Sequence, residues 1–216
     1  MAESRESPFQ PAHFERMDPS DDGLFYMTAR LVTHIDDAAI AAASRFYGEQ
    51  LPPRGRILDL MSSWVSHLPA GSAYASVAGL GMNAAELAVN PVLSERVVQD
   101  LNRDPVLPWP DASFDGAVVT VSVQYLTRPV EVFAEVARVL VPGSPFIVTF
   151  SNRCFPTKAV AIWRMTSDED HARVVGAYMG HSGAFGDITA HDLSPAPGQS
   201  DPMFAVVGRA LAVGGR

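Results

Sequence analysis

Short apolar runs alternate along the chain with longer segments in which apolar residues recur every three or four positions. The continuous runs are typical of buried strands and the periodic segments of helices. The predicted strands are Arg56–Leu60, Ala73–Ala78, Val97–Leu101, Phe114–Val121 and Pro145–Phe150. The predicted helices are Asp36–Leu51, Ser63–Leu68, Ala84–Val89, Pro91–Arg96 and Val130–Leu140. Because strands and helices take turns, we expect a mostly parallel sheet covered by helices on both faces.

The C-terminal third of the chain follows a different pattern. Two helices, Thr157–Met165 and Asp168–Met179, precede two strands, Ile188–Leu193 and Met203–Ala210, that are joined by a turn-rich segment. Consecutive strands without a crossover helix favour an antiparallel pair at the sheet edge. The fold expected is therefore a Rossmann-like, doubly wound α/β sheet of seven strands, mostly parallel, with an antiparallel edge strand near Met203–Ala210.

Composition places the chain among single-domain globular proteins. It has 216 residues, of which 47% are hydrophobic and 19% charged. We expect a mobile N-terminal segment over residues 1–20, followed by one domain over residues 21–216 whose first part, 21–52, forms a helical lid.

Charge and apolar run lengths exclude several function classes. The net charge of -8 disfavours nucleic acid, which is bound by neutralising phosphates with Lys and Arg. No apolar run approaches the roughly 20 residues that span a bilayer, and the N-terminal residues lack the apolar run of a signal peptide. The expected location is the cytoplasm, with a small molecule as substrate and no nucleic acid or membrane as partner. No metal-ligand spacing occurs, and the single cysteine, Cys154, predicts no disulfide and is expected to be inert.

The segment Arg56–Pro69 points to a cofactor site. Its apolar strand ends in an acid, Asp59, and runs into a Ser-rich turn. A loop between a buried parallel strand and the next element gathers free backbone N–H groups, which suit a nucleotide-like ligand.

The motifs together resemble the class I S-adenosylmethionine-dependent methyltransferases, over roughly Tyr26–Arg209. Ile57–Leu60 resembles the first motif of that family, Asp100–Asn102 and Leu107–Asp115 its third region and fourth strand, and Arg138–Gly143 the turn before its fifth strand. The resemblance implies S-adenosylmethionine as cofactor and methyl transfer to a small-molecule acceptor. The residues that it implies for cofactor binding are Asp59, Met61, Ser62, Ser63, Gly79, Asn83, Asp100 and Leu101, with Asp100 and Leu101 beside the adenine.

Two positions depart from the family pattern. The usual glycine-rich turn is replaced by Met61–Trp64, so serine side chains would approach the cofactor where glycines normally do. The acid that usually accepts the ribose hydroxyls is replaced by Gly81, and Asn83 or Glu86 would have to substitute for it.

Candidate catalytic residues lie ahead of the first strand. Tyr26, Arg30 and His34 are spaced at i, i+4 and i+8, and would share one face of a helix that either forms an active-site wall or is merely solvated. His34 and Tyr26 are the candidate bases if the acceptor atom is an oxygen. His67 is expected only to form a local hydrogen bond. The candidate substrate-binding residues are Arg30, Gln124, Tyr125, Asn152 and Arg153.

Three other functions stay open at this stage. One is a different reaction on the same cofactor, such as cyclisation or elimination. Another is a catalytically inactive binding module on the same fold. A dinucleotide oxidoreductase is disfavoured because no G-x-G-x-x-G sequence follows the first strand.

Overall fold

A computed structural model describes residues 8–212 and contains one seven-stranded sheet in the order β3-β2-β1-β4-β5-β7-β6. The strands are β1 (Arg56–Leu60), β2 (Ser76–Gly81), β3 (Glu95–Val98), β4 (Gly116–Thr120), β5 (Pro145–Phe150), β6 (Phe185–Asp192) and β7 (Phe204–Ala210). The pairs among β1 to β5 are parallel, whereas β7 is antiparallel to both β5 and β6. The predicted doubly wound sheet with an antiparallel edge is confirmed, and within that edge β6 is outermost while β7 lies one place inside.

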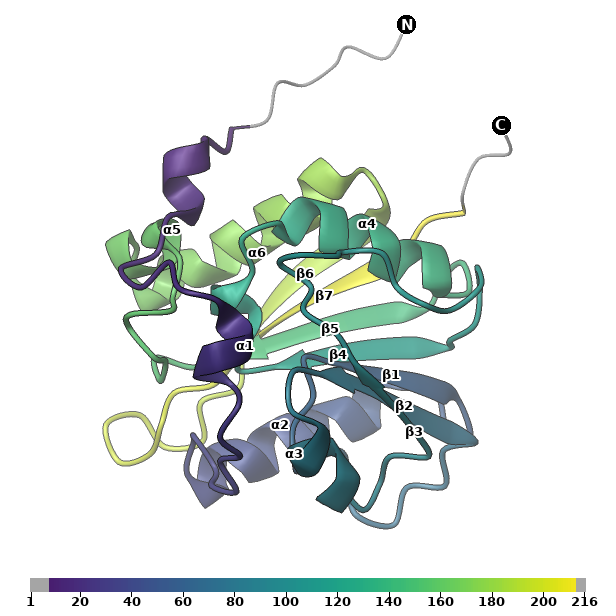
Figure 1. The fold of residues 1–216 in the computed structure, drawn as a ribbon. Coiled ribbons are helices and arrows are strands. Elements are labelled where there is room, and N and C mark those ends of the chain that lie inside the picture. Colours follow the sequence, from purple (N-terminus) through teal and green to yellow (C-terminus); the bar gives the residue numbers. More distant parts are fainter. Residues whose placement is uncertain (1–7, 213–216) are drawn as a thin grey trace, which may run out of the picture.

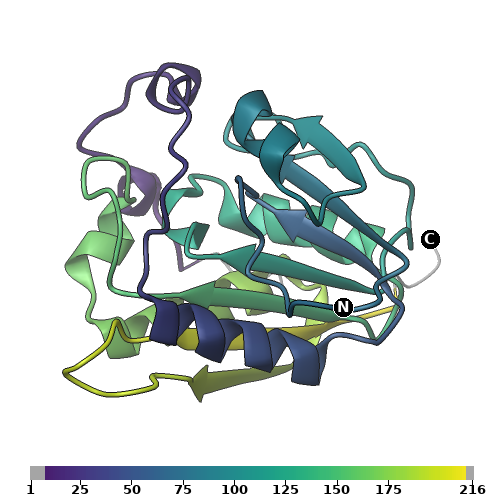
Figure 2. The ribbon, with the colours of Figure 1, turned by 90° about the horizontal axis from the view of Figure 1, so that it is seen from below.

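Helices cover both faces of this sheet (Figures 1 and 2). They are η1 (Pro11–Phe14), α1 (Asp22–Phe25), α2 (Asp37–Gln50), α3 (Ala84–Val89), η2 (Val123–Tyr125), α4 (Pro129–Val139), α5 (Ala161–Met165) and α6 (Asp168–Ser182). In Figure 1, α4 and α6 lie above the sheet and α2 and α3 below it. None of the helices in the described part of the chain is long and apolar enough to cross a membrane.

The two faces follow from alternation along the central strands. Leu58 and Val119 point into a core shared with α4 and α6, whereas their neighbours Ile57 and Val118 point into a core shared with α2. Successive side chains of a strand face opposite sides of a sheet, so strands buried on both faces must be apolar at nearly every position. The continuous apolar runs were therefore a reliable signal of central strands.

Two predicted helices between β1 and β3 are wrong. Ser63–Leu68 belongs to an irregular loop that follows β1 directly, in which Met61 and His67 both take the left-handed conformation, with φ of 56° and 52°. The serine hydroxyls of this loop bond carboxylates elsewhere in the fold, which competes with helix formation. The segment Pro91–Arg96 is a turn followed by β3, so β3 begins and ends earlier than the predicted strand Val97–Leu101.

The lid also differs from the prediction. Residues 26–36 contain no helix, so Tyr26, Arg30 and His34 do not share a helical face. The backbone of this segment is bonded by distant side chains, because Asn83 donates to the carbonyls of Tyr26 and Met27 and Glu86 accepts from the N–H of Arg30. Backbone groups that find such partners need no helix to satisfy them.

The first described residues pack on the body of the protein. Phe9 and Phe14 contact Tyr178 on α6, with ring centroids 5.0 and 6.1 Å away. Of the segment predicted to be mobile, residues 1–7 lie outside the described residues, and residues 8–20 are held by these aromatic contacts and by an ion pair between Arg16 and Asp22. The prediction of mobility rested on the polar composition of the segment, which gives no sign that a few of its side chains pack against the body of the protein.

Candidate functional site

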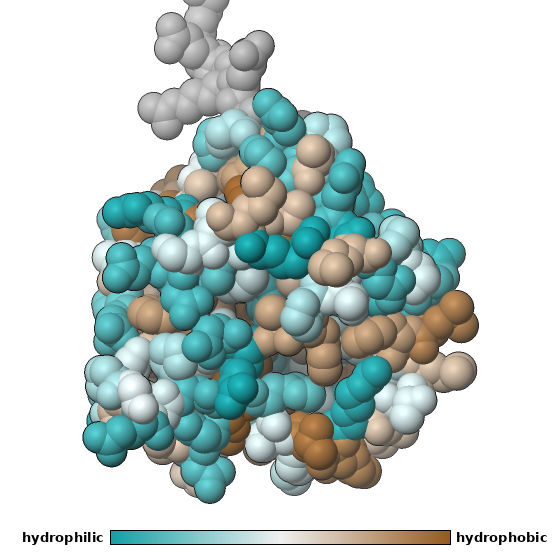
Figure 3. Space-filling view, turned by 90° about the vertical axis from the view of Figure 1, so that its left-hand side faces the viewer, coloured by the Kyte–Doolittle hydropathy of each residue, from teal (hydrophilic) through white to brown (hydrophobic). Residues whose placement is uncertain are grey.

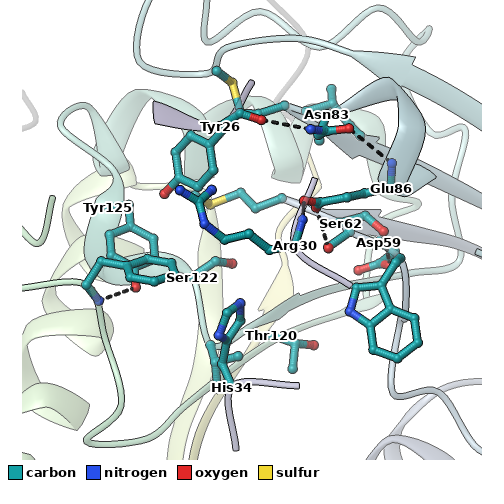
Figure 4. A pocket seen from close by; sticks show the side chains of 18 of the residues that line it. Tyr26, Arg30, His34, Asp59, Ser62, Asn83, Glu86, Thr120, Ser122 and Tyr125 are labelled. Atoms are coloured by element: carbon teal, nitrogen blue, oxygen red, sulfur yellow. Dashed lines mark hydrogen bonds between the residues drawn. The ribbon is translucent and has the colours of Figure 1, made fainter. Parts of the chain in front are cut away.

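A cavity of about 400 Å³ lies at the carboxyl ends of β1, β2 and β4 (Figure 4). The lid residues 22–34 form one wall, and loops that follow β1, β2, β3, β4 and β5 form the rest. Of the residues predicted for the site, the cavity brings together Tyr26, Arg30, His34, Asp59, Met61, Ser62, Ser63, Asn83, Asp100, Leu101, Tyr125 and Arg153. A cavity of this size at the switch from β1 to β4 is a usual place for a ligand in an open α/β sheet.

Three predicted residues do not line this cavity. Gly79 lies in the middle of β2, where a Cβ atom would lie 2.5 Å from a methyl carbon of Leu93. Gln124 is buried below the cavity wall and its amide nitrogen donates to the carbonyl of Val121 at 2.9 Å. Asn152 is exposed beside the loop after β5. The position past a strand end indicated the correct loops, but it did not distinguish which side chains turn inward.

The floor of the cavity contains a buried carboxyl group, Asp59, at the end of β1. Its side chain accepts a hydrogen bond from the Ser62 hydroxyl at 2.5 Å, and burial raises the pKa of Asp59 to about 7. Met61, between them, adopts a backbone conformation that favours glycine, and strain of this kind is most often found at ligand sites. The turn after β1 therefore contains, at Met61, one backbone conformation that glycine adopts readily, although it contains no glycine.

The absence of an acid at Gly81 has a steric cause. The carbonyl oxygen of Ser62 lies so close to the end of β2 that a Cβ atom on Gly81 would approach it to 2.1 Å. The Ser62 N–H also donates to the Leu80 carbonyl at 2.7 Å, which fixes this approach. No side chain fits at this position unless the turn after β1 moves.

Glu86, one turn into α3, brings a carboxylate to the same wall. One of its oxygens accepts from the Ser63 hydroxyl at 2.6 Å and the other from the backbone N–H of Arg30 at 2.7 Å. Asn83 caps α3 with its side-chain oxygen while its amide nitrogen donates to the Tyr26 carbonyl at 2.8 Å. These hydrogen bonds hold the lid against the start of α3. Figure 4 shows Glu86 and Asn83 on this wall of the cavity.

The loop after β3 forms the next wall. Asp100 accepts from the backbone N–H of Asn102 at 2.9 Å, and Leu101 is buried. The Asn102 amide donates both to the Asp22 carboxylate and to the Tyr125 carbonyl, each at 3.0 Å. Asn102 thus joins the lid, the loop after β3 and the loop after β4.

A buried ionic cluster fastens the lid behind this wall. The fully buried ammonium group of Lys158 lies 3.2 Å from both Asp18 and Asp22, and Arg16 lies 2.7 Å from Asp22. Although burial acts to raise the pKa of Asp22, hydrogen bonds from Arg16 and Asn102 hold it below its ordinary value. Sequence reasoning missed this cluster, because a lysine within a polar loop gives no local sign of burial.

The cavity lining also contains aromatic rings and two histidines, His34 on the lid and His67 on the loop after β1. The rings of His34 and Phe155 meet edge to face at 5.2 Å. Desolvation, together with neighbouring Arg30, lowers the pKa of His34, and burial beside His34 lowers the pKa of His67 to about 4. Both imidazoles are therefore neutral at neutral pH and can accept a proton or a hydrogen bond.

The hydroxyl groups of Tyr26 and Ser122 also line the cavity. Tyr26 is partly buried and its desolvation raises the pKa of its phenol above the usual range. The Ser122 hydroxyl is buried at the cavity surface with no hydrogen-bond partner in the described structure. An unsatisfied buried hydroxyl at a cavity indicates a position where a ligand or water completes the bonding.

Both the sequence and the fold of this chain are similar to those of known proteins. Residues 63–148 match the family described as methyltransferase domain. No curated protein sequence matches the chain significantly. Among solved structures, the [4+2]-cyclase SpnF has a TM-score of 0.61 and 16% identity over 85% of this chain and 89% of that chain.

Two bacterial methyltransferase structures are comparably similar. A SAM-dependent methyltransferase from Aquifex aeolicus has a TM-score of 0.57 and 15% identity, covering 81% of this chain and 92% of its own. A possible histamine N-methyltransferase from Thermotoga maritima has a TM-score of 0.59 and 15% identity, covering 80% and 89%. At these identities the structures show the shared fold, which is that of S-adenosylmethionine-dependent methyltransferases. Within that fold, residues 63–148 match the methyltransferase-domain family.

Proposed function

We propose that the protein transfers a methyl group from S-adenosylmethionine to a small-molecule acceptor. The observation that carries this proposal is a single cavity whose lining combines polar groups with aromatic rings. Carboxylates and serine hydroxyls come from the end of β1 and from the segments after β1 and β2, whereas Tyr26, His34, Tyr125 and Phe155 come from the lid and from the segments after β4 and β5. Such a lining suits a polar cofactor that meets a second, less polar molecule.

The polar residues of the lining fit the cofactor. Glu86 presents carboxylate oxygens that now accept from a hydroxyl and an N–H, and the ribose hydroxyls are donors of the same kind. The strained turn at Met61 and the Asp59–Ser62 pair would hold the methionine part, and Asp100 and Leu101 would flank the adenine. When bound, S-adenosylmethionine supplies an electrophilic methyl group on a positively charged sulfur.

The protein's own contribution is alignment, exclusion of water and, for an oxygen acceptor, removal of a proton. Alignment of two bound reactants contributes on the order of 7 kcal/mol to lowering a barrier. His34 is the proposed proton acceptor because it is neutral at neutral pH, whereas Tyr26, with its raised pKa, keeps its proton and would donate a hydrogen bond. The lid that carries both residues would close the cavity against solvent.

Calorimetry tests the proposal directly. S-adenosylmethionine and S-adenosylhomocysteine should bind, and NADH should not. Asp100→Ala should weaken binding of both, and unchanged affinity would contradict the placement of the adenine. Separate His34→Gln and Tyr26→Phe variants should alter turnover or cofactor binding by more than the ~0.5 kcal/mol typical of surface changes.

A reaction other than methyl transfer stays a candidate because SpnF, a [4+2]-cyclase, shares the fold. Product analysis distinguishes the possibilities. Methyl transfer generates S-adenosylhomocysteine in step with a methylated acceptor, whereas cyclisation or elimination of S-adenosylmethionine itself would consume it without forming either product. A cyclisation of another molecule would leave S-adenosylmethionine unchanged. A protein that binds the cofactor and alters no acceptor would be the inactive binding module.

A further inference from the structure

Large apolar side chains are exposed along the lid. Within residues 17–32, they are Met17, Leu24, Met27, Leu31 and Val32. Figure 3 shows apolar side chains gathered along the lower edge of the side that faces left in Figure 1, where the lid runs, with hydrophilic groups beside them. Single exposed apolar residues need no explanation, but several within one short segment mark a surface that contacts something apolar.

The surface formed by Leu31 and Val32, here named the lid shelf, continues into the cavity. Leu31 is 54% exposed and Val32 58% exposed, yet Val32 also lines the cavity. The Trp64 indole N–H donates to the Val32 carbonyl at 3.1 Å and holds the shelf against the loop after β1. The apolar surface is therefore continuous from outside the protein to the cavity wall.

The inner wall beyond the shelf is aromatic. Trp64 and Phe155 both line the cavity, and Phe155 contacts His34 edge to face. Aromatic rings in a cavity wall favour an apolar or ring-shaped ligand, because they offer large area with little conformational freedom to lose.

The cations on this side already have partners. Arg153 pairs with Asp201 at 2.8 Å, and the Arg30 guanidinium lies 4.6 Å from the ring centroid of Phe25 and 5.5 Å from that of Phe155. The lowered pKa values of His34 and His67 leave both rings uncharged at neutral pH. The cavity lining holds four acids, Asp22, Asp59, Glu86 and Asp100, against these two arginines, so the electrostatics favour an uncharged ligand over a carboxylate or a phosphate.

We propose that the methyl acceptor is an uncharged molecule with an apolar chain or ring system, whose reacting end enters between His34, Trp64 and Phe155 and whose apolar remainder lies on the lid shelf. This inference rests on the proposed methyl transfer and specifies its substrate class. It assigns to Leu31 and Val32 a role in acceptor affinity that is separate from cofactor binding.

The test uses two series of probes with the full chain, alone and loaded with S-adenosylhomocysteine. Binding of para-alkylphenols with ethyl to octyl chains, and of the matching para-alkylbenzoates, is followed by calorimetry and by the fluorescence of Trp64, with a Trp64→Phe variant to assign the signal. Affinity for the phenols should rise roughly two- to fourfold per added methylene, since a fully buried methylene contributes about fourfold. The benzoates should bind at least tenfold more weakly than the phenols of equal chain length.

Substitutions then locate the effect. Leu31→Ser and Val32→Ser should each make the affinity for the phenols depend less on alkyl chain length. Both should leave the affinity for S-adenosylhomocysteine unchanged. The control is Met165→Ser, which replaces an even more exposed apolar residue on α5 that does not line the cavity, and should keep the dependence. Equal slopes in all three variants, or tighter binding of the benzoates, would overturn the proposal.

The remaining outcomes separate this inference from the proposed function. If S-adenosylhomocysteine does not bind while the phenol series behaves as expected, the methyl-transfer proposal fails and the apolar site survives. If Leu31→Ser instead changes the sedimentation of the protein, or its binding to neutral lipid vesicles, without changing phenol affinity, the lid shelf is a contact for a protein or a membrane. In that case the acceptor assignment is wrong.

Discussion

At the scale of single residues, the candidate site depends on side chains in environments that change their chemistry. Asp59 is the clearest case, because its carboxyl group is buried at a strand end with a serine hydroxyl as its bonding partner. In the folded protein it keeps its proton up to about pH 7, whereas the unfolded chain releases it near 3.8. The folded state therefore binds more protons between these values, and the free energy of unfolding must fall as pH rises through this window.

Replacing Asp59 with Asn should remove this dependence. The lowered pKa values of His34 and His67 act in the opposite sense over this range, so the prediction concerns the difference between the two proteins. In urea unfolding at pH 5 and pH 8, the change in the free energy of unfolding from pH 5 to pH 8 should be more favourable to folding in Asp59→Asn than in wild type by a few kcal/mol. Asp37→Asn, at an exposed carboxylate on the first turn of α2, serves as the control and should follow wild type. Parallel pH profiles for wild type and Asp59→Asn would contradict the assigned pKa.

Glu86 gives a second prediction at this scale. If it takes over recognition of the ribose from the position blocked at Gly81, Glu86→Gln should weaken binding of S-adenosylhomocysteine by about tenfold or more, because hydrogen bonds to a charged acceptor contribute about 1.5–3 kcal/mol. The specific readout is the ratio between the affinities for S-adenosylhomocysteine and for its 2′-deoxy form. Wild type should bind the cofactor product more tightly than its 2′-deoxy form, and Glu86→Gln should bind the two nearly equally.

The control for Glu86 is Glu49→Gln, an exposed acid near the end of α2. If Glu86→Gln only loosened the lid, it would weaken the binding of both nucleosides by the same factor. Retained discrimination in Glu86→Gln would therefore show that this carboxylate clasps the lid without contacting the ribose.

At the scale of elements, the sequence predicted what depends on local pattern and missed what depends on distant partners. The central strands and the helices α2, α3 and α4 follow from apolar periodicity and caps, such as Asp36 before α2. The helices expected at Ser63–Leu68 and across the lid do not form, since their polar side chains or backbone groups bond to Asp59, Asn83 and Glu86. The bond to Asp59 is local, but the bonds to Glu86 and Asn83 join residues 23 to 57 positions apart, and no local window contains those.

The difference between local pattern and distant partners also explains which residues of the candidate site could be predicted. Asp59, Ser62 and Asp100 were predictable, because strand ends in a parallel sheet gather at one edge. Tyr26, Arg30 and His34 line the cavity as expected, although the helix that was to bring them there is absent. Lys158 and Asn102 were not predicted, because their importance comes from the buried carboxylate of Asp22, far away in sequence.

The ionic cluster leads to a prediction about the lid as an element. Lys158→Met removes a buried cation that lies between Asp18 and Asp22 and leaves Arg16 as the remaining cation beside Asp22. Removing one partner of a buried pair typically costs about 3–5 kcal/mol, and the retained Arg16 should keep the loss at or below the lower end of this range. The lid should detach before the rest unfolds. Limited proteolysis should then cut within residues 15–36 much faster than in wild type, while the near-ultraviolet circular dichroism of the sheet core is kept.

A double change provides the comparison for Lys158. Lys158→Met with Asp22→Asn removes charge from both sides of the pair and should recover part of the lost protection. If Lys158→Met and wild type were cut at equal rates, the cluster would not be what holds the lid in place.

At the scale of the whole molecule, a rigid sheet supports a site built almost entirely from loops. The floor is tied to the sheet and to α2 by the Tyr47 hydroxyl, which bonds both Thr120 and Thr149 at 2.6 Å. The walls come from the loops after five strands, and the lid crosses them from outside. A ligand in this cavity would therefore contact segments from much of the chain at once, while the β6–β7 edge lies apart from it.

This arrangement predicts how the molecule responds to cofactor. At a hundred times its dissociation constant, S-adenosylhomocysteine should stabilise the folded state by about 2.7 kcal/mol, which for a chain of this size raises the melting temperature by roughly 5–11 °C. In hydrogen exchange, protection should increase together over residues 26–34, the turn after β1 and residues 99–102, because these segments line one cavity. The amides of β6 and β7 should change only as far as global stability changes. A rise in melting temperature with added protection at the β6–β7 edge, and none in the lid, would mean that the ligand binds elsewhere and that the lid takes no part in closing the site.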